Sequence, residues 1–372
     1  MTVAITAKGM VASLGLDAHT CCAAARAGLM RSEELPYAFN DIWNKKVEYA
    51  IGHRVTLVTE GFEGPARLAR LMECGLRDLE SRTGRLDQIR PAFYLSLPSR
   101  FRTVCGNELV ADEEIRRQMT QTAGQASSER PYEDAARILQ QAARALTWGV
   151  VPSLRYATIS GHTGVAEAVS AALADFSSDS VNNAVVGGVD SLLDEETLDW
   201  LQQTGRLKTS AVPSGLLPGE AAAFVLLQRT DLSRTPPQAL IRSTHVLREN
   251  GAFLQGDPPS GVALSEVIRE TVKNLTDSER VWIITDQNGE PYRAQDWGLA
   301  VPRVLASPRD SILWYPAVSF GDTSAASGAV AICLAVRSFE RHYAPSNSLL
   351  ILSSADGTTR AAMCLESGRT VQ

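Results

Sequence analysis

The sequence has few of the residue patterns that hold metals or redox groups. Its six cysteines show no CxxC spacing, and its five histidines are scattered, with no HExxH motif and no cysteine–histidine cluster. Cys333 and Cys364 stand among apolar neighbours, as small core residues do. We therefore expect reduced cysteines, no metal site and no cofactor.

Long apolar runs and dense positive charge are also missing. No run reaches the ~18 apolar residues of a membrane-spanning helix, and the opening MTVAITAKGM lacks the basic start and long apolar core of a signal peptide. The net charge of −6 is spread along the chain, and its densest basic points, Lys45-Lys46 and Arg116-Arg117, are too short to follow a phosphate backbone. We expect a cytoplasmic protein with no membrane partner and no nucleic-acid partner.

The sequence does contain the composition and alternation of a globular α/β protein. Hydrophobic residues make up 44% of the 372 residues and charged residues 21%. Short apolar strands follow helical stretches repeatedly, which predicts an α/β fold. A proline-bearing segment at 233–240 separates an N-terminal half, 1–235, from a C-terminal half, 236–372. The expected strands are 1–10, 93–99, 153–159, 183–191, 221–229, 281–286, 315–318, 347–354 and 360–366, and helices are expected over 17–28, 111–147 and 194–204.

Two further expected helices, one in each half, have similar sequences. GHTGVAEAVSAAL and GDTSAASGAVAICLAV each join a turn of small residues to a helix of Ala, Gly, Ser and Val. A helix that is apolar nearly all round is buried, and its small residues let a second backbone approach closely. We predict that the helices starting near Gly161 and Thr323 are central, packed between one sheet from each half.

Five segments share a characteristic order and spacing: KGMVASLG at 8–15, SGHTGVAEA followed by AVVGGVDS, SGLLPGEAAAFVLL at 214–227, DQNGEPYRAQD at 286–296 and SFGDTSAASGAV at 319–330. Together they resemble motifs of the thiolase superfamily, and within it the β-ketoacyl-acyl-carrier-protein synthases. The resemblance implies a thiolase-like fold, with two pseudo-symmetric halves in an α-β-α-β-α layered arrangement around buried central helices. Residues 30–150 match poorly.

The family's catalytic residues are replaced. The resemblance implies a nucleophilic cysteine at the start of the first central helix and two histidines that stabilise an enolate, and Thr158, Asn288 and Asp322 stand at these positions. An alcohol ionises far less readily than a thiol, and an aspartate anion repels an enolate. Leu216 replaces the gatekeeping phenylalanine, and the glycine-rich loop reads SSADGTT at 353–359.

The same residues also have structural interpretations. Thr158, Ser160 and Asp322 are good helix N-caps. Ser160 and His162 remain weak catalytic candidates, and Glu220 is interpreted as a structural carboxylate. Close backbone approach is expected at Gly187, Gly188 and Gly219.

Two functions stay open at this point. The first is a noncatalytic ketosynthase-like protein, either a partner resembling the chain-length factors of type II polyketide systems or an accessory protein of a type VI secretion effector. The second is an active acyltransferase or hydrolase that uses Ser160 or Thr158. Expected partners are a second copy, an intact ketosynthase, an acyl carrier protein or a secretion effector. The family pairs subunits next to the strand NAVVGGVDS, so dimerisation is predicted there unless that strand is internal.

Overall fold

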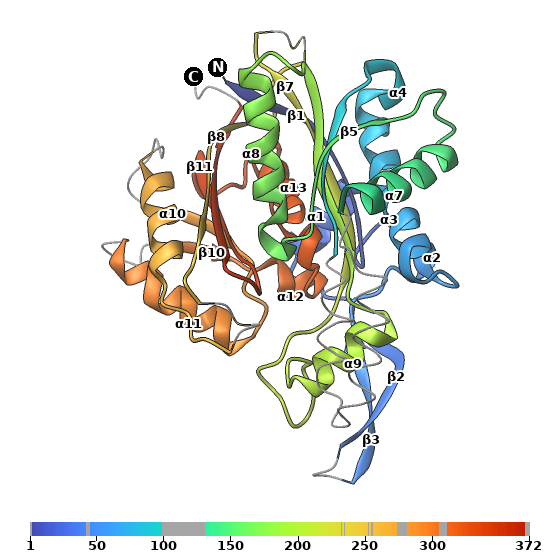
Figure 1. Ribbon diagram of the computed structural model, residues 1–372, viewed down its shortest axis with the longest axis vertical. Coiled ribbons are helices and arrows are strands. Elements are labelled where there is room, and N and C mark those ends of the chain that lie inside the picture. The colour runs from blue at the N-terminus through green and yellow to red at the C-terminus, as the bar shows by residue number, and fades with distance from the viewer. Residues whose placement is uncertain are drawn as a thin grey trace.

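The structure is a computed structural model of the 372-residue chain (Figure 1). It describes residues 2–41, 45–98, 131–231, 233, 235–251, 253, 256–273, 281–304 and 311–368. The expected helix over 111–147 therefore lies partly outside the described residues. Its described part forms α7 (Pro131–Ala145).

The strands repeat one topology twice. In the N-terminal half the order is β5-β4-β6-β7-β1, and in the C-terminal half it is β10-β9-β11-β12-β8. In each run the first three strands are parallel and the last two antiparallel, so the halves match strand for strand. The strands are β1 (Val3–Ala12), β4 (Ala92–Ser96), β5 (Ser153–Thr158), β6 (Asn183–Ser191), β7 (Glu220–Arg229), β8 (Ala239–Arg248), β9 (Trp282–Thr285), β10 (Ile312–Trp314), β11 (Ser348–Ser354) and β12 (Thr359–Ser367).

The two runs are joined into one ten-stranded sheet, which corrects the prediction of a separate sheet in each half. Antiparallel pairing of β1 with β8, from Val3 opposite Ile241 to Ile5 opposite Ala239, makes the connection. The proposed boundary at 235/236 falls in the link between β7 and β8, and as a domain boundary it stays a prediction.

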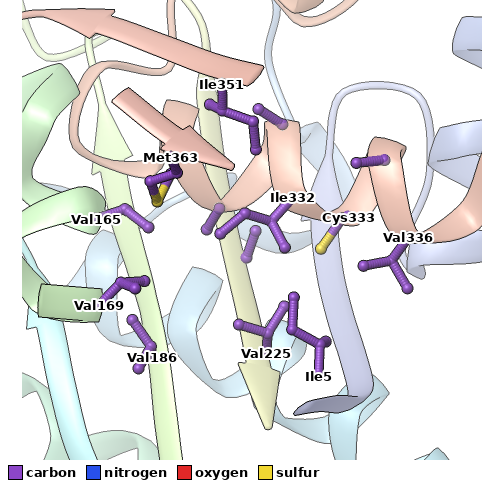
Figure 2. Packing of buried hydrophobic residues seen from close by; sticks show 14 of the residues in the cluster. Ile5, Val165, Val169, Val186, Val225, Ile332, Cys333, Val336, Ile351 and Met363 are labelled. Atoms are coloured by element: carbon purple, nitrogen blue, oxygen red, sulfur yellow. The ribbon is translucent and has the colours of Figure 1, made fainter. Parts of the chain in front are cut away.

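The two central helices lie between the two strand runs, as predicted. Each begins with a 3-10 turn: η1 (Gly161–Thr163) leads into α8 (Gly164–Ser177), and η5 (Ser324–Ala326) leads into α13 (Ser327–Glu340). In Figure 2, Ile332 of α13 lies between Val225 of one run and Ile351 of the other. The helix α1 (Ala18–Arg26) also packs against α13.

Close packing around these helices depends on glycine. A Cβ added to Gly188 of β6 would stand 2.1 Å from the carbonyl oxygen of Ala325, at the start of the second central helix. The predicted close approaches at Gly187 and Gly219 are confirmed as well, because an added Cβ would meet backbone oxygens at 2.1 and 2.2 Å. No larger residue fits these contacts without moving a backbone.

Outer helices cover the side of each strand run that faces away from the central helices, which completes the α-β-α-β-α layers (Figure 1). The helix α3 (Gly64–Thr83) packs on β1 and β7, and α7 lies beside α3 and β5. On the other side α10 (Val262–Val272) covers β8 and β12, with α11 (Pro291–Ala300) beside it. The short helical segments are α2 (Thr56–Thr59), α4 (Leu86–Ile89), α12 (Pro316–Phe320) and η3 (Val301–Arg303).

A small lobe extends from this body. The hairpin of β2 (Glu33–Asp41) and β3 (Lys46–Gly52) packs on α9 (Glu195–Gln203), away from the central helices (Figure 1). Leu216 is buried there, in a separate small core that includes Leu35, Trp200 and Leu207.

Two sequence expectations about strands are wrong. The expected strand at 315–318 is helical, because Pro316 occupies the first turn of α12, where its missing N–H costs nothing. The strand NAVVGGVDS is β6, which is internal between β4 and β7, so it cannot pair across a dimer. Among the described residues, β5 is the edge strand on this side.

No helix in the described ranges is long and apolar enough to cross a membrane.

Candidate functional site

Asn288 and Asp322, two of the three positions that the resemblance assigns to catalytic residues, contact each other directly. Asn288, in the loop between β9 and α11, donates from Nδ2 to Oδ2 of Asp322 at 2.5 Å. The other hydrogen of that amide nitrogen reaches Glu290 Oε2 at 2.8 Å, and Asn288 Oδ1 accepts from the Glu290 backbone nitrogen at 3.1 Å. The amide of Asn288 therefore has no N–H left to give to a substrate oxygen.

His162 completes this arrangement from η1 in the other half. Its Nε2 lies 2.9 Å from Asp322 Oδ1, and its Nδ1 lies 2.9 Å from Nη2 of Arg293. A guanidinium can only donate, so Nδ1 accepts and the proton sits on Nε2, which donates to Asp322. Only 4% of the His162 surface is exposed. Both ring nitrogens of His162 are engaged in hydrogen bonds, so this side chain is not available as a base.

Arg293 of α11 is the centre of the network. Its Nη1 donates to Asp286 Oδ2 at 2.9 Å and also to the carbonyl of Ser354. Its Nη2 also reaches Asp356 Oδ1 at 2.7 Å, and its Nε lies 3.4 Å from Glu290 Oε2. All three guanidinium nitrogens therefore have partners, although the side chain is buried.

A second buried arginine ties the same carboxylates to the N-terminal half. Arg206 donates to both oxygens of Glu290, at 2.5 and 3.0 Å, and to Asp356 at 2.9 Å. Its guanidinium also lies over the rings of Trp200 and Phe253. We call this set the ionic network: His162, Arg206, Asp286, Asn288, Glu290, Arg293, Asp322 and Asp356.

The network controls the ionisation of its carboxylates. Burial alone raises the pKa of Asp322, but the neighbouring His162 and Arg293, with hydrogen bonds from His162 and Asn288, hold it well below its usual range. Burial also raises the pKa of Asp356, but the positive charges of Arg206 and Arg293 outweigh this effect and hold the pKa below its usual range. Burial dominates at Asp286 and raises its pKa. Asp322 is therefore an anion with three hydrogen-bond donors, since Oδ1 also accepts from the Ser324 backbone nitrogen at 2.7 Å.

Little space remains beside the network. A cavity of about 20 Å³ is bordered by His162, Asn288, Asp322 and residues of α13 such as Gly328 and Ala331. This is enough for a water molecule. Ligand pockets are commonly ~300–1,000 Å³, so the described residues leave no room here for an acyl chain.

Thr158 and Ser160 belong to a different cluster. Thr158 is the last residue of β5, and its hydroxyl lies 2.8 Å from that of Ser160. Both hydroxyls donate to Oε2 of Glu167 in α8, at 3.0 and 2.9 Å, and Thr163 donates to the other carboxylate oxygen at 3.2 Å. The structure therefore brings Asn288, Asp322 and His162 together, whereas the side-chain hydrogen bonds of Thr158 and Ser160 go to each other and to Glu167.

The start of the first central helix carries no cysteine. The first residue of η1 is Gly161, with a φ of 57°, and Thr158 precedes it by three positions in the strand. Asp322 satisfies a backbone N–H at the start of the second helix, as predicted, through its bond to Ser324, although the N-cap position itself is Thr323. The prediction that Ser160 is a cap is wrong, because its side chain makes no capping hydrogen bond and turns to Glu167 instead.

Glu220 is a structural carboxylate, as interpreted from the sequence. It is fully buried and accepts from Nε and Nη2 of Arg67 at 2.6 and 3.0 Å. The Val55 backbone nitrogen and the Thr59 and Ser191 hydroxyls bind it as well. These five bonds fasten α3 and the segment before it to the sheet.

Sequence reasoning missed the charged partners. Asp286, Glu290 and Arg293 stand in the quoted segment DQNGEPYRAQD, and Asp356 stands in SSADGTT. Five charged or amide residues within the eight positions 286–293 were the available signal. Arg206 has no comparable signal, because its partners are 84 and 150 positions away.

No protein-family model matches the sequence, and no curated protein matches it at a significant level. Solved ketosynthases do match in structure. The ketosynthase from module 6 of the bacillaene synthase of Bacillus subtilis has a TM-score of 0.73 and 11% identity, covering 99% of this chain and 72% of that chain. The ishigamide ketosynthase/chain length factor has a TM-score of 0.68 and 14% identity, covering 99% of both chains. A type II polyketide synthase ketosynthase in complex with its acyl-carrier protein has a TM-score of 0.74 and 13% identity, covering 98% of this chain and 99% of that chain.

At sequence identities of 11–14%, this structural similarity shows the fold alone. The repeated strand order, the two central helices and the near-complete coverage agree. The chain therefore has the thiolase-like fold of ketosynthases and of the ketosynthase/chain length factor.

Proposed function

We propose that this protein is a noncatalytic member of a ketosynthase-like assembly, a partner subunit in the manner of a chain length factor. The observation that carries the proposal is the ionic network, which occupies the place between the halves where the resemblance puts the reaction centre. His162 and Arg206 come from the N-terminal half, and Asp286, Glu290, Arg293, Asp322 and Asp356 come from the C-terminal half.

The arrangement of donors and charge at Asn288 and Asp322 is unsuited to a condensation reaction. Decarboxylation creates an enolate, which needs donors that are free to bind it. The Asn288 amide hydrogens are already bound to Asp322 and Glu290, and the low pKa of Asp322 keeps a negative charge at the second position. An enolate next to this carboxylate is destabilised instead of stabilised.

The alternative activity, with Ser160 or Thr158 as nucleophile, has less support. A hydroxyl nucleophile needs a base that is itself oriented by a third group. The two hydroxyls share Glu167, whose carboxylate already accepts from several groups, while both nitrogens of His162 bind Asp322 and Arg293. Active-site electrophiles should therefore leave Ser160 and Thr158 unmodified.

The open sheet edge is a candidate surface for a partner subunit. Strand β5 ends the sheet, and its Ser153 and Arg155 side chains are exposed. An uncovered edge strand offers backbone donors and acceptors to another strand. We propose a homodimer, or a heterodimer with an intact ketosynthase, and an acyl carrier protein as a further partner of that assembly.

Co-purification with a ketosynthase and a carrier protein tests this function. Light scattering on the chain alone and mixed with the ketosynthase measures assembly, and product formation measures its effect. We expect a dimer, and no product from acyl and malonyl carrier proteins unless the ketosynthase is present. Product from the chain alone, above a Thr158→Ala control, would refute the noncatalytic function. A monomer that binds only a secretion effector would favour the accessory role.

A further inference from the structure

A second cavity lies at the other end of the N-terminal strand run. It opens at the amino-terminal ends of the parallel strands β4 and β5, whereas the ionic network lies beyond their carboxyl-terminal ends. Its volume is about 180 Å³. An apolar cavity of about 150 Å³ can hold a molecule the size of benzene. Most of its lining is apolar: Leu86, Pro91, Phe93, Trp148, Val150 and Pro152.

Two aromatic walls of this cavity are fixed by their neighbours. The rings of Phe93 and Trp148 lie 5.8 Å apart between centroids, at an angle of 38°. Trp148 Nε1 donates to Oε1 of Glu80 at 2.9 Å, and Phe93 is buried in the core beneath α3 and α7. These contacts fix both rings in place, packed against each other.

The cavity has one carboxylate and one guanidinium in its lining, and they differ in their partners. The negative charge of Asp87 is already paired, because Arg85 donates to both of its oxygens and the Gly149 backbone nitrogen donates to one of them at 3.0 Å. Arg90 is exposed, and its guanidinium has no hydrogen bond or ion pair with any residue that the structure describes. The cavity therefore offers a positive charge that is still available.

We propose that this cavity binds a small aromatic or branched aliphatic carboxylate, with the apolar group beside Phe93 and Trp148 and the carboxylate paired with Arg90. Exposed apolar side chains at the same site agree with a ligand-covered rim, since Val150 is 36% and Val151 is 77% exposed. The proposal is independent of the noncatalytic function.

Titration of the full-length protein with benzoate tests the site. The indole N–H signal of Trp148, identified by its loss in Trp148→Phe, reports binding at this cavity in ¹H–¹⁵N spectra. We expect a saturable shift of that signal with benzoate, and an affinity about tenfold weaker with neutral benzamide, which lacks the charge that Arg90 pairs with.

Matched variants separate the charge from general effects. Arg90→Gln should reduce benzoate affinity to that of benzamide, and Val151→Asp, at an exposed rim position, should also weaken it. Arg144→Gln removes an exposed positive charge of α7 outside the cavity lining and should change nothing. No Trp148 shift with benzoate, or equal benzoate affinity in the Arg90→Gln and Arg144→Gln proteins, would overturn the proposal.

Discussion

Arg293 donates to the Nδ1 atom of His162 at 2.9 Å, across 131 positions of the chain and between its two halves. This hydrogen bond fixes the ring as an acceptor on one side and a donor to Asp322 on the other. A histidine held in this way is a structural connector. The contact therefore joins the turn that begins the first central helix to α11 of the C-terminal half.

Removing the central arginine should destabilise the protein strongly. Arg293→Met leaves Asp286 and Asp356, whose side chains are 8% and 27% exposed, without this buried partner, and breaking a buried ion pair typically costs about 3–5 kcal/mol. Urea unfolding measures the loss. The control is Arg269→Met, whose exposed pair with Glu266 should contribute less than about 1 kcal/mol. Equal stability of the two variants would contradict the account of the network.

The network also predicts a loss of stability in acid. The pKa values of Asp322 and Asp356 are lower in the folded state than in the unfolded chain. Their contribution is therefore complete above the unfolded-state pKa of about 4 and is lost as the pH falls below it. Asp286, with a raised pKa, contributes with the opposite sign.

A single variant separates these contributions. Asp322→Asn should be less stable at neutral pH and should lose less further stability than the natural protein between about pH 5 and pH 3. Denaturant unfolding at several pH values gives both quantities. Parallel curves for the two proteins, offset by a constant, would show that Asp322 does not carry the acid response.

Restoring the nucleophile alone should not restore chemistry. Thr158→Cys introduces a thiol, but Asn288 and Asp322 still provide no free donor for an enolate. We expect at most an alkylatable cysteine and no decarboxylation of malonyl carrier protein. Carbon dioxide release by this variant above that of Thr158→Ala would show that the two positions can support the reaction after all.

The close approach at Gly188 should tolerate no side chain. Gly188→Ala places a Cβ 2.1 Å from the Ala325 carbonyl and should cost about 1–3 kcal/mol or prevent folding. Gly298→Ala is the matched control, since it lies in α11 with open space around it and should stabilise the helix by up to about 1 kcal/mol. Thermal unfolding of both variants compares them directly, and similar melting temperatures would contradict the packing argument.

Local patterns predicted the frame of this fold, and long-range contacts decided its details. The small residues after Gly161 and Thr323 predicted two buried helices, because a helix without a polar face has to be covered. Residues 315–318 look like a strand in isolation, yet Pro316 starts a helix. The apolar run in β6 suits an edge or an interior strand equally, and only the pairing with β4 and β7 decides between them.

The site was predictable only in part, for the same reason. The sequence drew attention to Asn288 and Asp322 through the resemblance of the segments that contain them. Their direct contact, and the burial of Arg206 and Arg293 against carboxylates, depend on loops that meet only after folding. Arginines are exposed in most proteins, so no local pattern marks these two as buried.

Intact mass spectrometry after incubation with acyl and malonyl carrier proteins or acyl-CoA tests the central claim most directly. The ionic network leaves a cavity of about 20 Å³, and the carboxylate beside Thr158 and Ser160, that of Glu167, already accepts from both hydroxyls and from Thr163. The account therefore predicts an unchanged protein mass. An acyl adduct mapped to Thr158 or Ser160, and absent from the corresponding alanine variant, would contradict it.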